Sequence, residues 1–192
     1  MLIAFEGGEG AGKSTQARLL AARLGAVLTF EPGGTPLGAQ LRAALLDGDA
    51  VDPRAEALLM AADRAQHRSD VIEPALDRGV HVVTDRYLYS SLAYQGYGRG
   101  LDVEAVRALS QFAEAPEADL VILLIVPAGV RRERLQGRLD RIEADDEQFH
   151  ERVEKGFLEL AERDPERWVV IAATGAVEDI AELVWTEVNG RL

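Results

Sequence analysis

The sequence predicts an α/β fold, a doubly wound parallel sheet of five strands with helices on both faces. Three observations support this prediction. Five short apolar runs alternate along the chain with segments of helical periodicity, which is typical of parallel sheets covered by helices. The first run leads directly into a glycine-rich turn. The fourth run, residues 120–126, is apolar throughout, as expected of a central strand buried on both faces.

The five strands are expected at runs rich in aliphatic and β-branched residues, namely 2–5, 26–30, 80–84, 120–126 and 168–171. Helices are expected where apolar residues recur every three or four positions. These segments are 14–24, 37–47, 53–79, 90–97, 103–114, a helix that starts near 127, 149–162 and 177–188. Pro74 should kink or restart the third helix, and Gly79 should end it.

Length and composition limit the function. A chain of 192 residues suits one domain, here residues 1–192, with one short mobile insertion. The net charge of −12 argues against nucleic-acid polymers as partners, although a small anionic substrate is compatible with arginines gathered in one cleft. No cysteine, signal peptide or membrane-length apolar run is present. We therefore expect a cytoplasmic enzyme with no membrane partner.

The glycine-rich turn fits the phosphate-loop pattern G-x-x-x-x-G-K-[ST] between a strand and a helix. Its backbone N–H groups and the helix N-terminus can hold phosphate oxygens, while Lys13 reaches the β- and γ-phosphates of a nucleoside triphosphate and the Ser14 hydroxyl holds Mg²⁺. A chance match is the alternative, but the strand and helix on either side favour the phosphate loop. The residues expected to bind the triphosphate are Gly7, Gly8, Glu9, Gly10, Ala11, Gly12, Lys13, Ser14 and Thr15.

Polar residues also follow the third strand, where open α/β sheets bind ligands. Asp85 could hold hydrated Mg²⁺ and Arg86 could bind a phosphoryl group; a structural ion pair at the sheet edge is the alternative. Glu9 would be repelled by triphosphate, so we expect it to contact a hydroxyl donor of the substrate or the metal rather than phosphate. The alternative interpretation is that Glu9 is a solvated loop residue without a functional contact.

Five arginines between residues 131 and 141 are expected within about three turns of the helix that starts near 127. We expect two or three of them in a lid of about residues 136–147, where positive charge stabilises a transferring phosphoryl group. Arg131 and Arg132 are the weakest candidates, and ordinary solvated charge is the alternative for the rest. The three histidines, His67, His81 and His150, lack metal-ligand spacing and are expected at the surface or on helix faces.

Several stretches together closely resemble the bacterial thymidylate kinase family, a group of phosphate-loop nucleoside monophosphate kinases. The phosphate loop alone is shared by many nucleotide enzymes, whereas the Glu-Pro-Gly-Gly and Ser-Ser-x-Ala-Tyr-Gln elements are more specific. The resemblance spans nearly the whole chain, and the stretches that carry it are residues 6–15, 31–35, 85–87, 90–96 and 139–143.

The resemblance implies transfer of the γ-phosphoryl group of ATP to thymidine 5′-monophosphate (dTMP), with Mg²⁺, by a homodimer. It implies that Arg64 binds the thymine edge, that Tyr94 stands against the sugar C2′ and that Glu9 meets the 3′-hydroxyl. Arg42 and Arg86 would hold the monophosphate. The full set of residues implied for dTMP is Glu9, Glu31, Pro32, Arg42, Met60, Arg64, Arg86, Ser90, Ser91, Tyr94 and Gln95. The residues expected to act in catalysis are Glu9, Lys13, Arg86, Arg138 and Arg141, with Ser14 and Asp85 at the metal.

The chain departs from the family at two positions. The family commonly has arginine before Glu-Pro-Gly-Gly, where this chain has Phe30, and loss of that cation predicts weaker dTMP binding unless the ring packs beneath the loop. Phenylalanine often stands where this chain has Met60, whose sulfur can also pack on a ring.

Three other functions are considered. Another nucleoside monophosphate kinase of this fold would prefer a different acceptor, and a binding protein without activity would rest on Phe30. A GTP switch would need an Asn-Lys-x-Asp element, but the one asparagine of the chain is Asn189, beside Gly190.

Overall fold

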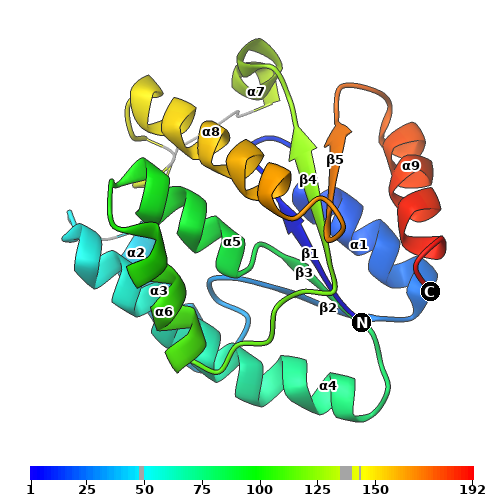
Figure 1. Ribbon diagram of the computed structural model, residues 1–192, viewed down its shortest axis with the longest axis horizontal. Coiled ribbons are helices and arrows are strands. Elements are labelled where there is room, and N and C mark those ends of the chain that lie inside the picture. The colour runs from blue at the N-terminus through cyan, green and yellow to red at the C-terminus, as the bar shows by residue number, and fades with distance from the viewer. Residues whose placement is uncertain (48–49, 135–139, 143) are drawn as a thin grey trace.

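The computed structural model describes residues 1–47, 50–134, 140–142 and 144–192 (Figure 1). Its sheet has five parallel strands in the order β2-β3-β1-β4-β5. The strands are β1 (Leu2–Glu6), β2 (Val27–Phe30), β3 (Val82–Asp85), β4 (Leu120–Ile125) and β5 (Trp168–Ala172). The predicted five-stranded parallel α/β sheet is therefore confirmed.

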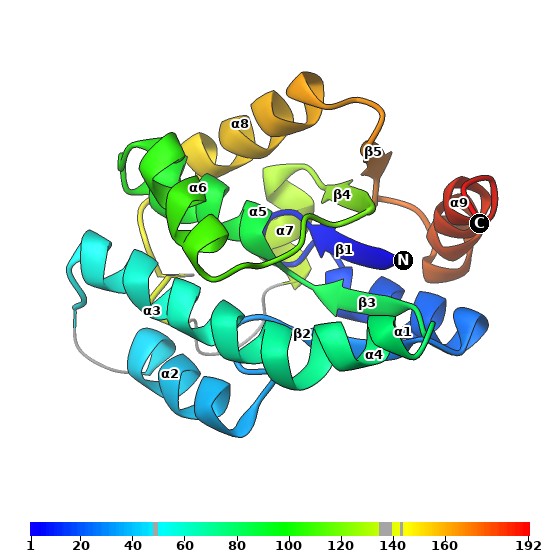
Figure 2. The same cartoon turned by 60° about the horizontal axis from the view of Figure 1, so that its bottom comes forward.

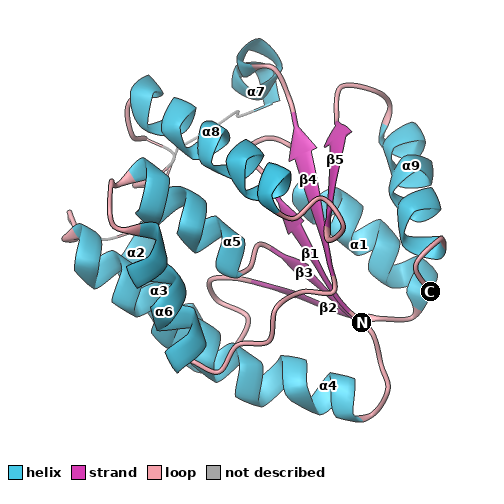
Figure 3. Cartoon of the chain, in the orientation of Figure 1, coloured by secondary structure: helices cyan, strands magenta, loops and turns pink. Residues whose placement is uncertain are grey.

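Helices cover both faces of the sheet (Figures 2 and 3). Because side chains alternate along a strand, Ile3 and Phe5 of β1 pack against α1 (Lys13–Leu24) and α9 (Val177–Asn189), whereas Leu2 and Ala4 belong to the core on the opposite face. That face is covered by the helices of the middle of the chain. They are α2 (Pro36–Leu46), α3 (Pro53–His67), α4 (Glu73–Asp77), α5 (Leu88–Ser91), α6 (Val103–Phe112) and α8 (Glu147–Arg163).

Two π-helical segments interrupt the helices of this face. Residues Arg68–Ile72 join α3 to α4, and Pro74 then stands in the first turn of α4, where its missing N–H is not needed. The second segment, Leu92–Gly98, continues α5. Gly79 follows α4 with φ 72°, a left-handed conformation that glycine adopts at low cost. The predicted restart at Pro74 and the end near Gly79 are both confirmed.

The arginine-rich segment is not one helix. Helix α7 (Ala128–Arg134) carries Arg131 and Arg134, but Arg141 lies in a turn, so the expectation of a single helix reaching Arg141 was wrong. Asp146 then caps α8 by accepting a hydrogen bond from the N–H of Phe149 at 2.7 Å. Among the described residues, no helix is long and apolar enough to cross a membrane.

Candidate active site

The loop after β1 depends on glycine at defined positions. Gly7 has φ 133°, and a Cβ there would lie 2.3 Å from the carbonyl oxygen of Leu124. Gly12 has φ 92° and precedes the first residue of α1. These two positions allow the chain to turn sharply from the buried strand to the N-terminus of α1, which directs backbone N–H groups toward the space above the loop.

Lys13 is the first residue of α1, and its Nζ donates to the carbonyl oxygen of Gly8 at 2.8 Å. Its side chain is buried, with only 6% of the residue exposed. Burial is the main reason that the pKa of Lys13 is lowered, and nearby Arg86 adds to it. The ammonium group is therefore already held beside the loop where a phosphate oxygen would bind.

Ser14 and Asp85 meet at the carboxyl ends of β1 and β3. The Ser14 hydroxyl donates to one oxygen of Asp85, and the other oxygen, Oδ1, is buried without a hydrogen-bond partner among the described residues. A hydroxyl and a carboxylate are hard oxygen ligands of the kind that Mg²⁺ prefers, and Mg²⁺ sites usually take their remaining ligands from phosphates and water. The described residues contain no cluster of three metal-ligating side chains, so the pair suits a metal shared with a nucleotide.

Arg86 follows Asp85 with φ 68°, and this left-handed backbone turns its side chain back over the phosphate loop. Its guanidinium donates to the carbonyl oxygen of Gly7 at 3.2 Å and to Ser90 Oγ at 3.1 Å, and it forms an ion pair with Glu9. It donates as well to Tyr94 Oη at 3.3 Å. The alternative interpretation was an ion pair between Asp85 and Arg86 at the sheet edge. Among the described residues, Arg86 forms its ion pair with Glu9 instead.

Glu9 is a partly buried member of this cluster rather than a solvated loop residue. It accepts a hydrogen bond from Tyr94 Oη at 3.1 Å in addition to its pairing with Arg86. Burial alone would raise the pKa of Glu9, but Arg86 and Lys13 outweigh it and lower that pKa to about 2. The Glu9 side chain is therefore an ionised acceptor at neutral pH.

A pocket opens beside this cluster. All eleven residues that the sequence assigned to the acceptor line it: Glu9, Glu31, Pro32, Arg42, Met60, Arg64, Arg86, Ser90, Ser91, Tyr94 and Gln95. Leu46, Tyr87, Asp140 and Ile142 complete the lining and were not predicted. The Glu9–Arg86 pair lies where the pocket meets the phosphate loop.

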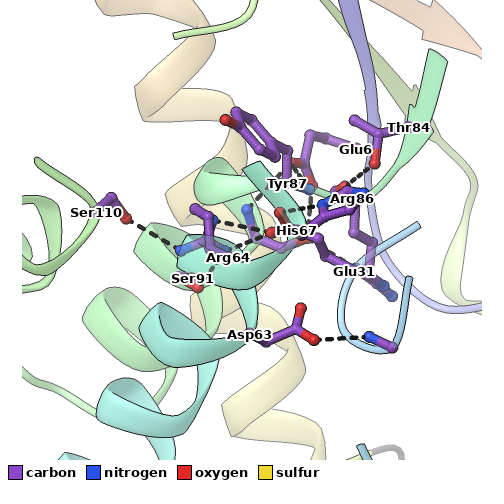
Figure 4. A network of polar contacts seen from close by, with 12 residues as sticks. Glu6, Glu31, Asp63, Arg64, His67, Thr84, Arg86, Tyr87, Ser91 and Ser110 are labelled. Carbon is purple, nitrogen blue, oxygen red and sulfur yellow. Dashed lines mark hydrogen bonds and ion pairs between the residues drawn. The ribbon is translucent and has the colours of Figure 1, made fainter. Parts of the chain in front are cut away.

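A buried polar network forms one wall of this pocket (Figure 4). The Nε of Arg64 donates to Glu31 at 2.9 Å. Its terminal nitrogens reach two hydroxyls, those of Ser91 and Ser110, each at 3.0 Å. These contacts fix the position of the guanidinium at the pocket wall, and they tie α3 to the loop after β2 and to the segments that follow β3.

His67 belongs to the same network. Its Nδ1 lies 2.8 Å from Glu31, and its Nε2 lies 2.6 Å from Thr29 Oγ1. It lies on helix α3, as one of the two expected placements required, but it is fully buried and not at the surface. His81 and His150 are half-buried. Because His67 sits behind Glu31, its role is to fix the loop rather than to contact a ligand.

Phe30 packs against the loop that follows it. A Cβ on Gly33 would lie 3.1 Å from the Phe30 ring, and the Arg42 guanidinium lies 5.9 Å from the ring centre. Arg42 also donates to the carbonyl oxygen of Pro32 at 2.9 Å. Of the two outcomes considered for Phe30, the ring beneath the loop is the one found, although 44% of the residue remains exposed.

The predicted lid arginines occupy different places. Arg138 lies outside the described residues. Arg141 donates to the carbonyl oxygen of Leu45 at 2.8 Å and to Glu56 at 2.6 Å, on the acceptor side. Beside the phosphate loop stands Arg134 instead, which donates to the carbonyl oxygens of Gly10 at 3.3 Å and Ala173 at 3.0 Å.

Two carboxylates at the site, Glu6 and Glu56, were not predicted from the sequence. Glu6 ends β1 and accepts hydrogen bonds from Ser90 and from the N–H of Tyr87. It could have been found by the rule that identified Asp85, because both are polar residues at the carboxyl end of a strand. Glu56 gave no such signal, since it stands in an ordinary helical segment and its partners come from distant parts of the chain.

Comparison with known proteins agrees with this geometry. A family model described as thymidylate kinase matches residues 5–184. The chain belongs to the thymidylate kinase family. Curated thymidylate kinases that resemble it include one from Synechococcus sp. (strain JA-2-3B'a(2-13)), 48% identical with 100% of this chain and 96% of the relative covered. Another, from Thermomicrobium roseum, is 48% identical, with 97% and 93% covered.

A solved structure supports the same assignment. The crystal structure of thymidylate kinase from Ehrlichia chaffeensis matches with a TM-score of 0.82 and 31% identity, covering 98% of each chain. The family and the fold predicted from the sequence are therefore both confirmed.

Proposed function

We propose that this thymidylate kinase family member transfers the γ-phosphoryl group of ATP to dTMP, giving ADP and dTDP for DNA synthesis. The observation that carries this conclusion is the junction of two sites. A phosphate loop with a buried lysine opens, at the Glu9–Arg86 pair, into a pocket lined by all the residues expected for dTMP. The donor and acceptor phosphates would meet there, so catalysis is chiefly positioning and charge stabilisation.

On the donor side, residues Gly7–Thr15 would surround the triphosphate through backbone N–H groups. Lys13 would exchange its hydrogen bond with the Gly8 carbonyl for one with a phosphate oxygen. Arg134 is a further donor-side candidate, because it already bridges the phosphate loop and the segment after β5. The Mg²⁺ ion would be held by Ser14 and Asp85, and it would neutralise charge on the phosphate oxygens.

On the acceptor side, Arg42 and Arg86 would hold the monophosphate, and Glu9 would accept from the sugar 3′-hydroxyl. Thymine presents an acceptor, O4, next to a donor, N3–H. Arg64 supplies donors at the pocket wall, while Gln95 Oε1 is a buried acceptor without a partner among the described residues. A thymine edge satisfies both groups, with Ser91 and Met60 beside the ring and Tyr94 against the sugar.

Three further points complete the proposal. A lid of about residues 136–147 would carry Arg138 and Arg141, and Asp140 and Ile142 of that stretch line the pocket. The enzyme would act in the cytoplasm, where its nucleotide substrates are found. It would be a homodimer, and exposed apolar side chains such as Leu58 of α3 (56% exposed) and Phe112 of α6 (90% exposed) are candidates for its interface.

The proposal is tested with a coupled assay for ADP, using ATP, Mg²⁺ and a panel of nucleoside monophosphates. We expect kcat/KM for dTMP to exceed that for AMP, dGMP and dCMP by about 10²-fold or more, because a mismatched acceptor leaves buried polar groups unpaired. Faster turnover of another acceptor would assign the site to a different monophosphate kinase. Absence of turnover with every acceptor would favour a binding protein.

A further inference from the structure

Glu56 is a fully buried carboxylate on the first turn of α3 that no part of the proposed reaction uses. Its Oε1 accepts hydrogen bonds from Gln95 Nε2 at 2.9 Å and from Arg99 Nε at 3.2 Å. Its Oε2 accepts from Arg99 at 3.3 Å and from Arg141 at 2.6 Å. Four hydrogen bonds saturate a carboxylate, so this side chain is held in one position from three sides.

The surroundings of Glu56 keep it ionised. Burial alone would raise the pKa of Glu56, but the hydrogen bonds from Gln95, Arg99 and Arg141 outweigh burial and lower it. The N-terminus of α3 also favours a negative charge in its first turn. An ionised carboxylate has no proton to donate and can only accept hydrogen bonds.

This restriction fixes the orientation of the Gln95 amide. Only the NH₂ group of Gln95 can face an anion, and the amide oxygen must therefore turn the other way. That oxygen is buried and without a partner among the described residues, and Gln95 lines the acceptor pocket. If Glu56 were neutral, the amide could reverse and present NH₂ in place of the oxygen.

We propose that Glu56 is a positioning residue that sets base specificity by holding Gln95 with its amide oxygen toward the acceptor base. This inference rests on the proposed function, because it takes Gln95 to be a contact of the base. An amide oxygen accepts from a base whose ring nitrogen carries hydrogen, as N3–H does in thymine and uracil. It repels cytosine, whose N3 is an acceptor. Glu56 thus excludes cytosine nucleotides without touching them.

The test compares dUMP with dCMP as acceptors, since neither carries the thymine methyl group and they differ only along the base edge. Turnover of dTMP by the wild type is measured first and reports on the proposed function separately. Glu56→Gln should then lower the ratio of kcat/KM for dUMP to that for dCMP by about tenfold or more, the value of one buried hydrogen bond replaced by a mismatch. In a Gln95→Ala background, the same substitution should leave the ratio unchanged.

Asp145→Asn is the matched control. Asp145 pairs with Arg99 at 2.7 Å, so this variant disturbs the same arginine but not the contact between Glu56 and Gln95, and the ratio should stay within about twofold of the wild type. Should Glu56→Gln fail to fold, Glu56→Asp replaces it. The shorter side chain withdraws the carboxylate from the amide and should lower the ratio by a smaller factor. An unchanged ratio in the folded variant, with activity on both acceptors reduced equally, would overturn the proposal and leave Glu56 a structural residue.

Discussion

Glu6 connects the stability of this protein to pH in a direction unusual for a carboxylate. Its Oε1 accepts from the N–H groups of Tyr87 at 3.0 Å and Ser90 at 3.2 Å, and its Oε2 accepts from Ser90 Oγ at 2.5 Å. Burial raises the pKa of Glu6 from 4.5 to about 7, and the hydrogen bonds and the cations Arg86 and Lys13 only partly oppose it. The folded protein therefore holds a proton on Glu6 that the unfolded chain has released.

Proton binding by Glu6 sets the direction in which the free energy of unfolding changes with pH. Between pH 4.5 and pH 7 the folded state binds more protons at this site than the unfolded state, so the contribution of Glu6 to the free energy of unfolding is present below pH 4.5 and is lost as the pH rises through 7. A tenfold change in proton affinity is worth about 1.4 kcal/mol, so the contribution should fall by roughly 2 to 3 kcal/mol between pH 5 and pH 8.

Glu6→Gln removes this titration while keeping the contacts. The amide oxygen can still accept from both N–H groups, and its NH₂ group can donate to the Ser90 hydroxyl. The free energy of unfolding is measured by urea unfolding followed by circular dichroism at pH 5 and pH 8. Between these two pH values, the variant should gain roughly 2 to 3 kcal/mol of stability relative to the wild type. Glu151→Gln, at an exposed position of α8, is the control for loss of charge. A difference between Glu6→Gln and wild type that does not change with pH would refute the reasoning.

Three further predictions concern activity. Lys13→Ala should lower kcat by about 10²-fold or more, because a cation beside the transferring phosphate is lost; near-normal kcat in a variant shown to be folded would contradict the phosphate-loop assignment. Arg141→Ala should lower kcat more than it raises KM for either substrate if Arg141 acts in the transition state, whereas a pure KM effect would mean that it only attracts nucleotide. Phe30→Arg would raise kcat/KM for dTMP about tenfold if a cation were missing. The packing of Phe30 against Arg42 leads us to expect a change of less than about threefold, and a tenfold rise would show otherwise.

Much of the fold could be predicted because the sequence patterns that mark its strands and turns are local. Runs of aliphatic residues marked all five strands, and the glycines of residues 7–12 marked the turn after the first. Part of the site could be predicted for the same reason. In a parallel sheet, the loop that follows one strand lies beside the end of the neighbouring strand. Ser14, which follows the loop after β1, therefore meets Asp85 at the end of β3, although the two are far apart in sequence.

What could not be predicted depends on which distant side chains come together. A lone histidine on a helix carries no sign that Glu31 and Thr29 will enclose it, as they do His67. The burial of Lys13 depends on how the loop folds over it. The spacing of the arginines could not predict that Arg134 contacts the phosphate loop and Arg141 contacts Glu56. Arg134 lies on α7 and Arg141 in a turn, so helical periodicity does not relate their positions.

The central claim is that the phosphate loop and the acceptor pocket serve one reaction, and ³¹P NMR of the purified enzyme with ATP, Mg²⁺ and dTMP tests it most directly. The account predicts that ADP and dTDP appear in equal amounts, with no accumulation of inorganic phosphate. Consumption of ATP with release of inorganic phosphate and no dTDP would contradict it, because the γ-phosphoryl group would then be passing to water and not to a nucleotide held beside Arg86.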